Sequence, residues 1–325
     1  MAVHIRRREF VATLGGAVVA WPVAMHAQQL KMPTIGALVI GNINPEQFWR
    51  EFRQGLRDLG YVEGKNIRFE FRSAEGHLDR LPELAAELVR LKVDVIVTWF
   101  TPTALAAKQA TREIPIVMAE TGDPIGTGLV ASLPRPGGNV TGMASVAAEL
   151  AGKSVQLIRE MLPSARRVTA LANATDPFSK PFLEQIKLGG EATGTTINAI
   201  GVSSNEEFET AFAGMELDRP DALIVQPSLP TKRAAELAVK HRVPAVSVPR
   251  WFAEEGGLMS YSPRYVELFR EAAVFVDKIL KGAQPADLPV EQPTHFELVL
   301  NLKTAQALGL TIPGSFLLRV DALIE

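Results

Sequence analysis

Polar and aromatic side chains that could hold a small organic ligand follow the apolar runs of this chain. In the N-terminal half they are Asn42, Trp99, Thr101, Thr121 and Asp123. In the C-terminal half they are Asn173, Gln226, Ser228, Trp251 and Tyr261. A tryptophan offers an apolar plate, and a few hydroxyl, amide and carboxylate groups beside it fix the orientation of a ligand. These residues are therefore the candidate ligand-binding residues.

Some of these residues have a second interpretation. Trp99 and Trp251 are equally typical of packing in a core or between lobes. Asp123 directly precedes a proline, so its carboxylate can cap a helix that begins there and can also contact a ligand. For a ligand that resembles an amino acid, we expect Asp123 to pair with the ammonium group. Hydroxyls and backbone N–H groups near Thr101 and Thr121 would then receive the carboxylate.

The sequence contains no constellation that points to catalysis, to a metal or to a cofactor. It has no cysteine, and its five histidines are scattered without metal-ligand spacing on one helix face. Phosphate-binding, nucleophile-elbow and zinc-protease motifs are absent, and Gly126-x-Gly128 lacks the third glycine of a dinucleotide site. The net charge of −2 provides no basic field for nucleic acid. We therefore expect a binding protein and not an enzyme.

The loop that carries Thr121 and Asp123 follows an apolar run, Ile114 to Ala119, that predicts a buried strand. In an open α/β sheet, the loop after the carboxyl end of a strand lines the ligand crevice. An ordinary connection between a strand and a helix is the alternative interpretation. Pro124 predicts the start of a short helix, which two further prolines end before a new strand begins.

Strand and helix patterns alternate from Pro33 onward. In the N-terminal half, strands are predicted near residues 34–40, 66–71, 93–97 and 114–119. The series repeats in the C-terminal half, with strands near residues 167–172, 196–202, 221–225, 245–248 and 258–261. We expect Asn44 and Thr101 to cap helices that follow two of the strands. Strands that alternate with helices favour parallel sheets, so we predict an α/β fold with two lobes of similar order.

The first residues have the composition of an export signal, which we place at residues 1–27. Arg6, Arg7 and Arg8 precede an apolar run, Phe10 to Val23, that is shorter than a membrane span of about 20 residues. The sequence Arg-Arg-Glu-Phe at positions 7 to 10 resembles a twin-arginine signal. Because there is no cysteine to carry a lipid, we expect a soluble periplasmic protein without a lipid anchor.

Three blocks of sequence carry a family likeness. The first runs from Phe52 to Asn66 and the second from Asp123 to Gly142; the third combines residues 256–261, 278–282 and 288–293. Together they closely resemble the solute-binding proteins of ABC transporters in the tryptophan/tyrosine-type family, over nearly the whole chain. The resemblance implies a type I periplasmic-binding-protein fold, with two flavodoxin-like lobes, three crossovers and a hinged cleft. It further implies an amino-acid ligand, often aromatic, that is delivered to a membrane permease.

The repeated series and the resemblance give the expected organisation. The first lobe would combine residues 33–146 with 262–291, and the second lobe residues 147–261 with 292–325. We expect a monomer that binds a small organic ligand between the lobes and serves an ABC importer. The main alternative is an exported ligand sensor for a membrane receptor kinase, because one fold serves both functions. A third possibility is an exported enzyme, and the missing cofactor motifs count against it.

Overall fold

The computed structural model describes residues 32–41 and 46–325. The expected export signal, the candidate ligand residue Asn42 and the expected cap Asn44 all lie outside the described residues. Within the described part, no helix has both the length and the apolar character that a membrane crossing requires.

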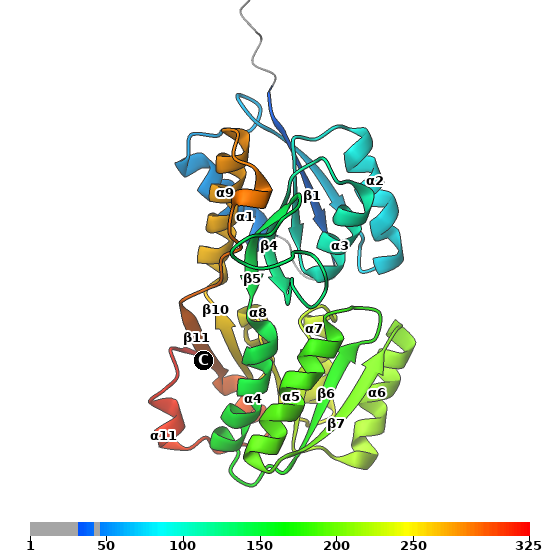
Figure 1. Cartoon of the computed structure of the whole chain (residues 1–325). Coiled ribbons are helices and arrows are strands. Elements are labelled where there is room, and N and C mark those ends of the chain that lie inside the picture. Colours follow the sequence, from blue (N-terminus) through cyan, green and yellow to red (C-terminus); the bar gives the residue numbers. More distant parts are fainter. Residues whose placement is uncertain (1–31, 42–45) are drawn as a thin grey trace, which may run out of the picture. The chain divides into compact units, whose positions relative to one another are not determined.

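A parallel sheet, five-stranded over the described residues, forms the centre of the first lobe (Figure 1). Its strands follow the order β2-β1-β3-β4-β5. Its strands are β1 (Thr34–Val39), β2 (Arg68–Ser73), β3 (Val95–Trp99), β4 (Ile116–Gly122) and β5 (Val140–Ser145). Every neighbouring pair runs parallel. The strands β3, β4 and β5 are buried along their whole length, as strands covered on both faces are.

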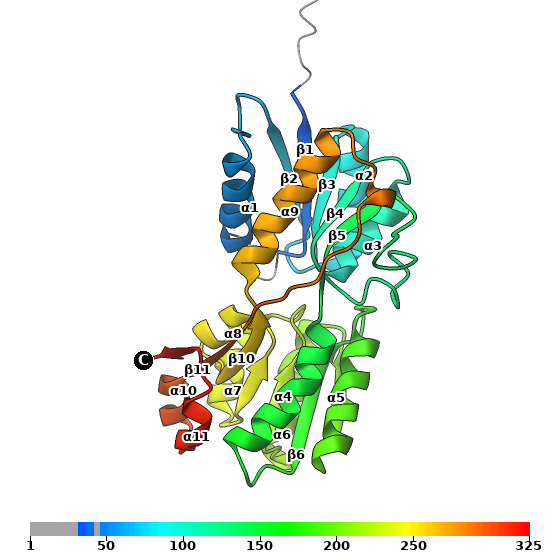
Figure 2. The same ribbon diagram turned by 60° about the vertical axis from the view of Figure 1, so that its left-hand side comes forward.

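Two pairs of helices cover this sheet. One face packs against α1 (Glu46–Asp58) and α9 (Tyr265–Leu280), and the other against α2 (Leu81–Arg90) and α3 (Thr101–Ala110) (Figure 2). Helix α9 is distant in sequence from its neighbours, yet it lies beside α1. Gly55 permits this approach, because a Cβ atom there would lie 2.9 Å from the Cβ of Ala273. A late segment of the chain thus completes the first lobe.

A larger sheet, seven-stranded within the described residues, forms the second lobe, in the order β12-β11-β10-β9-β8-β6-β7. Its strands are β6 (Arg167–Asn173), β7 (Thr196–Val202), β8 (Ala222–Val225), β9 (Ala245–Ser247), β10 (Met259–Pro263), β11 (Phe296–Asn301) and β12 (Ala322–Ile324). Only the β10–β11 pair is antiparallel among the described strand pairs. The lobe is therefore an α/β structure in which parallel pairing dominates.

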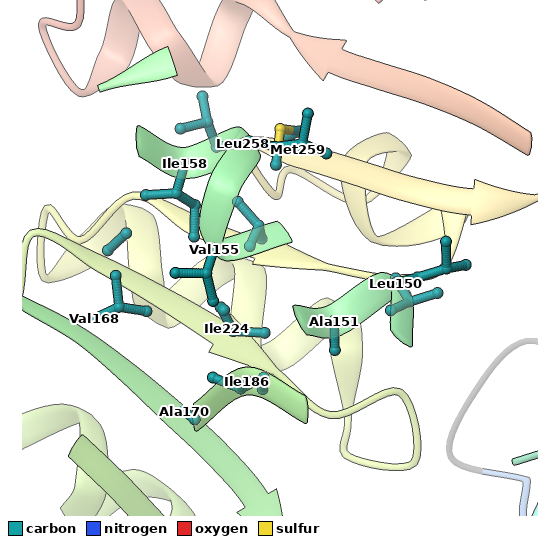
Figure 3. Packing of buried hydrophobic residues seen from close by; sticks show 14 of the residues in the cluster. Leu150, Ala151, Val155, Ile158, Val168, Ala170, Ile186, Ile224, Leu258 and Met259 are labelled. Carbon is teal, nitrogen blue, oxygen red and sulfur yellow. The ribbon is translucent and has the colours of Figure 1, made fainter. Parts of the chain in front are cut away.

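Helices cover both faces of this sheet as well. One face packs against α4 (Ala147–Met161), α5 (Ser179–Thr193), α10 (Leu302–Ala307) and α11 (Gly314–Leu317). The other packs against α6 (Asn205–Asp218), α7 (Thr231–Lys240) and α8 (Arg250–Glu254). Figure 3 shows Val155 and Ile158 of α4 over Val168 and Ile224 of the sheet. Burial of each such side chain contributes about 1.5–3 kcal/mol, so this layer holds the lobe together.

The chain passes between the lobes at three places in its described part. It leaves β5 for α4, leaves β10 for α9, and returns through residues 292–295 to β11. The last passage is fastened to the first lobe, because Ala144 N–H donates to the carbonyl oxygen of Glu291 at 2.8 Å. The two passages at β10 and β11 are joined by a hydrogen bond from Arg264 N–H to the carbonyl oxygen of His295, at 3.1 Å.

The stretch after β4 differs from our expectation. Thr121 and Gly122 belong to the strand and not to the loop. The short helix expected at Pro124 is absent: a single turn forms, in which Thr127 N–H donates to the carbonyl oxygen of Asp123 at 3.1 Å. Gly128 then adopts a φ of 74°, and this left-handed conformation ends a helical turn.

The prediction that Thr101 caps α3 is wrong. Phe100 occupies the N-cap position, and Thr101 is the first helical residue. The Thr101 hydroxyl instead donates to the carbonyl oxygen of Gly122 on β4, at 3.1 Å. Phe100 has a φ of 74°, which is rare for a bulky residue and marks a strained turn where the chain leaves β3.

Candidate ligand site

The carboxyl ends of β3, β4 and β5 bring a tryptophan beside a buried acid. The strand register shifts after Thr98, so Trp99 lies opposite Glu120. Phe100 N–H donates to the carbonyl oxygen of Glu120 at 2.8 Å, which fixes the backbone at this edge. Ser145 ends β5 on the other side of β4. The edge of the sheet where ligands bind in this class of fold therefore carries an acid, an indole and a hydroxyl.

Glu120 is a buried carboxyl group, and the described residues provide no buried counter-charge for it. Burial raises its pKa from 4.5 to about 7; the Ser145 hydroxyl opposes this rise and Asp176 adds to it. The indole N–H of Trp99 also favours the charged form, although it makes no hydrogen bond of good geometry. The Oε2 atom of Glu120 has no hydrogen-bond partner among the described residues. It is an acceptor left free inside the protein.

An aromatic cluster, which we define as Trp99, Trp251 and Tyr265, lies next to this carboxyl group, which interacts with Trp99 and Tyr265. The ring centroids of Trp99 and Trp251 are 5.6 Å apart in an edge-to-face arrangement, and those of Trp251 and Tyr265 are 4.6 Å apart. All three side chains are buried. Burial raises the pKa of Tyr265 well above its ordinary value, and the negative charge of Glu120 adds to this rise. Trp99 comes from the first lobe, Trp251 from α8 of the second, and Tyr265 from the start of α9.

The second lobe contributes another buried acid, held in a network. Asp176 Oδ2 accepts hydrogen bonds from Gln226 Nε2 at 2.8 Å and from the Ser228 hydroxyl at 2.6 Å. Its Oδ1 accepts from Phe178 N–H at 2.9 Å. Burial raises the pKa of Asp176, and these three donors act in the opposite direction. The network occupies Asp176 with protein donors, whereas Glu120 keeps a free oxygen.

The two acids lie near each other although they belong to different lobes. Asp176 disfavours the charge on Glu120 directly. The lobes also meet next to Glu120, because a Cβ atom on Gly122 would lie 2.3 Å from the ring of Phe178. Glycine at position 122 therefore permits this approach of β4 to the segment before α5.

Several buried polar atoms in this region lack a partner among the described residues. Among the residues with such an atom are Glu120, Trp99, Trp251, Tyr265 and Thr121. Leaving one buried donor or acceptor unpaired costs about 1–3 kcal/mol, so native proteins seldom tolerate several together. A bound molecule with matching donors and acceptors would remove this cost.

The other candidate residues predicted from the sequence have defined places. Gln226 and Ser228 hold Asp176, and Asn173 Oδ1 accepts from the Thr175 hydroxyl at 2.7 Å. Tyr261 packs on Phe296 in the second lobe, with ring centroids 6.1 Å apart. Asp123 Oδ1 accepts from Gly126 N–H at 2.9 Å, so this carboxylate organises its own turn. The backbone of Asp123 has a φ of 39°, so Asp123, like Phe100, adopts a positive φ close to Glu120.

Sequence reasoning missed Glu120, Asp176 and Tyr265. Glu120 directly follows an apolar run, and Asp176 stands before a proline in a loop. Tyr265 begins a helix with a regular apolar pattern. Only Glu120 offered a signal in the sequence, namely a carboxylate at the end of a predicted buried strand. Such an acid rarely enters an apolar environment without a function.

A pocket of about 330 Å³ adjoins the aromatic cluster. Trp251, Tyr265 and Val266 form the apolar part of its wall, and the remaining lining is polar or charged: Gln47, Arg250, Arg264, Glu267 and Glu297. Arg250 Nη1 lies 2.6 Å from Glu297 Oε2, and Arg264 Nη1 lies 3.7 Å from Glu267 Oε1. Both arginines next to the cluster are thus paired already. The described residues contain no group of acids and histidines that could hold a metal ion.

Two α/β lobes that exchange late segments and carry buried groups at their strand ends define a type I periplasmic binding fold. Residues 46–324 match the family described as ABC transporter substrate binding protein, and the chain belongs to that family. The tyrosine-binding protein of Clostridioides difficile (strain R20291) is 28% identical over 265 residues, which are 80% of this chain and 75% of the relative.

Two solved structures are also similar. An ABC domain from Streptococcus pneumoniae in complex with L-Trp has 29% identity and a TM-score of 0.84, covering 90% of this chain and 99% of that chain. A conserved domain protein from Vibrio cholerae has 27% identity and a TM-score of 0.85, covering 90% of this chain and 100% of that chain. These matches confirm the family likeness and the fold class predicted from the sequence.

Proposed function

We propose that this protein is the extracytoplasmic receptor of an ABC importer and binds a small organic ligand between its lobes. The ligand combines an aromatic part with an ammonium group, as aromatic amino acids do. The observation that carries the proposal is the set of unpaired buried polar atoms on the aromatic cluster and on Glu120. The tyrosine-binding relative and the structure with bound L-Trp support the same ligand class.

Each group has a role in this proposal. The ring of Trp251 contacts the apolar part of the ligand, and the cationic group lies at Glu120. The ring of Trp99 is stacked on Phe48 and Phe100, so Trp99 contributes its unpaired indole N–H. Asp123, which the sequence favours as the partner of the cationic group, stays a candidate contact in the adjoining loop. Asn42 also stays a prediction. A ligand that touches both lobes stabilises their closed arrangement, because it binds that arrangement better than the open one.

The same proposal covers the membrane partner and the compartment, and it assigns the protein no catalytic activity. A closed, loaded receptor would dock on a membrane permease and release the ligand there. We place the mature protein in the periplasm as a soluble monomer without a lipid anchor, and residues 1–27 would be the signal that directs its export.

Replacing Arg7 and Arg8 by lysine should then leave precursor in the cytoplasm, which cell fractionation would detect.

Native mass spectrometry of the purified protein, followed by calorimetry with aromatic amino acids and amines, tests the binding function. We expect a stoichiometry of one and a loss of affinity of about tenfold or more in Trp251→Phe, which keeps a ring but removes the indole N–H. Trp49→Phe, on α1 and outside the aromatic cluster, is the matched control and should bind as the wild type does. Equal binding by both variants, or no binding by any panel member, would contradict the proposal.

A further inference from the structure

Two buried acids from different lobes, Glu120 and Asp176, interact at the candidate site without a base beside them. No lysine, arginine or histidine is among the buried residues that the structure describes. The acids are linked through Phe178, whose N–H donates to Asp176 and whose ring lies against Gly122. Two carboxylates held together away from water disfavour each other's charge, so one of them needs a proton or another positive charge.

We propose that Asp176 keeps a proton on Glu120 while no ligand is bound, and that the ammonium group of the ligand displaces this proton on binding. The inference rests on the proposed function, which places the cationic group of the ligand at Glu120. Asp176 is then a positioning residue, because it acts on the ligand through Glu120. Ligand binding is thereby coupled to the release of a proton.

The hydrogen bonds decide which of the two acids carries the proton. Asp176 accepts from Gln226, Ser228 and Phe178 N–H, and these donors favour its charged form. Oε2 of Glu120 has no hydrogen-bond partner among the described residues, so a proton can reside there. In agreement, burial raises the pKa of Glu120 to about 7, and Asp176 adds to this rise.

The other groups that interact with Glu120 do not exchange protons near neutral pH. Ser145 of β5 and Trp99 of β3 are neutral and favour the charged form of Glu120. Tyr265 of α9 is a phenol whose burial raises its pKa well above the ordinary value, so it also stays neutral. The arginines of the adjoining pocket are paired with glutamates. The proton exchange therefore belongs to the two acids.

The remaining unpaired donors suit the carboxylate of an amino acid. The indole N–H of Trp251 and the hydroxyls of Tyr265 and Thr121 lack acceptors among the described residues. A carboxylate offers acceptors to such donors, whereas a carboxylate at Glu120 would meet the negative charge of Asp176. The ammonium group therefore goes to Glu120, and it brings the positive charge that the proton provided.

The exchange has a defined proton balance. Neutral Glu120 gives its proton to the solvent, and the ammonium group, which keeps its own protons, takes the place beside the carboxylate. Since Glu120 titrates at about pH 7 before the ligand binds, about one proton should leave per ligand at pH 6 and about a tenth of a proton at pH 8. The affinity should be about tenfold lower at pH 6 than at pH 8 for the same reason.

Calorimetry on the unmodified protein measures this release. L-tryptophan and L-tyrosine, which stay zwitterions over this range, are titrated at pH 6 and pH 8 in phosphate and in ACES buffer. The ionisation enthalpies of the two buffers differ, so the difference in heat gives the number of protons released. Indolepropionate, which has no ammonium group, is the matched ligand control and should release no proton at either pH.

Asp176→Asn tests the role of Asp176, because it removes the charge and keeps an acceptor for Phe178 N–H. The pH at which half a proton is released should fall in this variant. Glu191→Gln, on the exposed side of α5, is the control and should leave that pH unchanged. Far-UV circular dichroism checks the fold of both variants.

The outcomes separate this inference from the proposed function. Binding of L-tryptophan or L-tyrosine without proton release at pH 6 would overturn the inference and leave the proposed function intact. Release of a proton by indolepropionate would also overturn it, as would an unchanged pH profile in folded Asp176→Asn. No binding of either amino acid at either pH would overturn both. Because the ligand titrations use the wild-type protein, they decide the inference even where the Asp176 variant does not fold.

Discussion

Glu120 couples the stability of the ligand-free protein to pH. Its pKa rises from 4.5 in the unfolded chain to about 7 in the fold, mainly through burial. The folded protein therefore holds a proton that the unfolded chain releases. The corresponding stability is complete below pH 4.5 and is lost as the pH rises through about 7. The shift amounts to about 3 kcal/mol.

Glu120→Gln should remove this dependence, because a neutral amide of the same shape replaces the titrating group. We expect the free energy of unfolding of the variant, relative to wild type, to rise by about 3 kcal/mol between pH 4 and pH 8. Urea unfolding at several pH values measures it. Asp176, Tyr265, Trp99 and Ser145 face this group and are present in both proteins. Glu191→Gln, on the exposed side of α5, is the control; a parallel pH profile for both variants would contradict the assignment.

Asp176 should be more important for folding than its small size suggests. Asp176→Ala would leave the Gln226 amide, the Ser228 hydroxyl and Phe178 N–H without their acceptor in a buried place. We expect a loss of about 3 kcal/mol, since each unpaired buried donor costs about 1–3 kcal/mol and partial rearrangement recovers some of it. Asp221→Ala removes an acceptor of two backbone N–H groups near the surface and should cost less. Equal losses in urea unfolding would show that burial of the network is unimportant.

The candidate site was predictable from the sequence only in part. Trp99, Trp251 and Thr121 follow apolar runs, and the structure places all three among the buried groups without partners. Glu120 offered one signal, its place directly after an apolar run, whereas Asp176 offered none, because the environment of a single acid depends on segments far away in the chain. Gln226 and Ser228, which were predicted as ligand contacts, donate hydrogen bonds to Asp176, and their contact with a ligand stays a prediction. Sequence patterns locate the strand ends, but only the fold shows which polar groups already have partners.

At the scale of elements, the long strands and helices agree with their sequence patterns, because apolar periodicity reports burial directly. The short helices α8 and α11 and the strand β12 were not foreseen. Each spans three to five residues, too few for a periodic signal. The helix expected after Pro124 fails for a local reason, since Gly128 adopts a left-handed conformation after a single turn. Backbone conformation at single glycines thus decides what the patterns leave open.

Gly142 on β5 provides a test at this scale. Its φ is 121°, and a Cβ atom there would lie 2.3 Å from the carbonyl oxygen of Met118 on β4. Gly142→Ala should therefore separate the two strands and cost about 3 kcal/mol or more. Gly138→Ala, in the turn before β5, meets no atom within 4 Å and should change stability by less than about 0.5 kcal/mol. Similar unfolding midpoints for both variants would refute this account of β5.

At the scale of the whole protein, the division into lobes at residues 33–146 with 262–291 and 147–261 with 292–325 stays our proposal. Helix α9 lies against α1 of the first lobe, and β11 pairs with β10 of the second. The passages of the chain between them are the positions where a closing motion would be absorbed. Such a closing motion would change the contact of Gly122 with Phe178, because this contact joins β4 to the segment before α5.

Gly122→Ala should therefore impair ligand binding through closure. The added methyl group would overlap the ring of Phe178, where the Cβ atom would lie 2.3 Å from a ring carbon. A ligand that contacts both lobes would then have to displace the ring, and overpacking of this kind costs about 1–3 kcal/mol. We expect the affinity for the ligand identified by the panel to fall about tenfold or more, as 1.4 kcal/mol is one decade. Calorimetry measures the affinity, and small-angle scattering measures the decrease in radius of gyration on binding.

The double variant Gly122→Ala with Phe178→Ala separates closure from a general loss of stability. Removing the ring makes room for the methyl group, so the double variant should regain affinity relative to Gly122→Ala even though Phe178→Ala leaves a cavity that lowers stability. A stability effect alone would make the double variant worse than either single variant in both measurements. Wild-type affinity and an unchanged decrease in radius of gyration for Gly122→Ala would show that the ligand does not bind by closing the lobes at this contact.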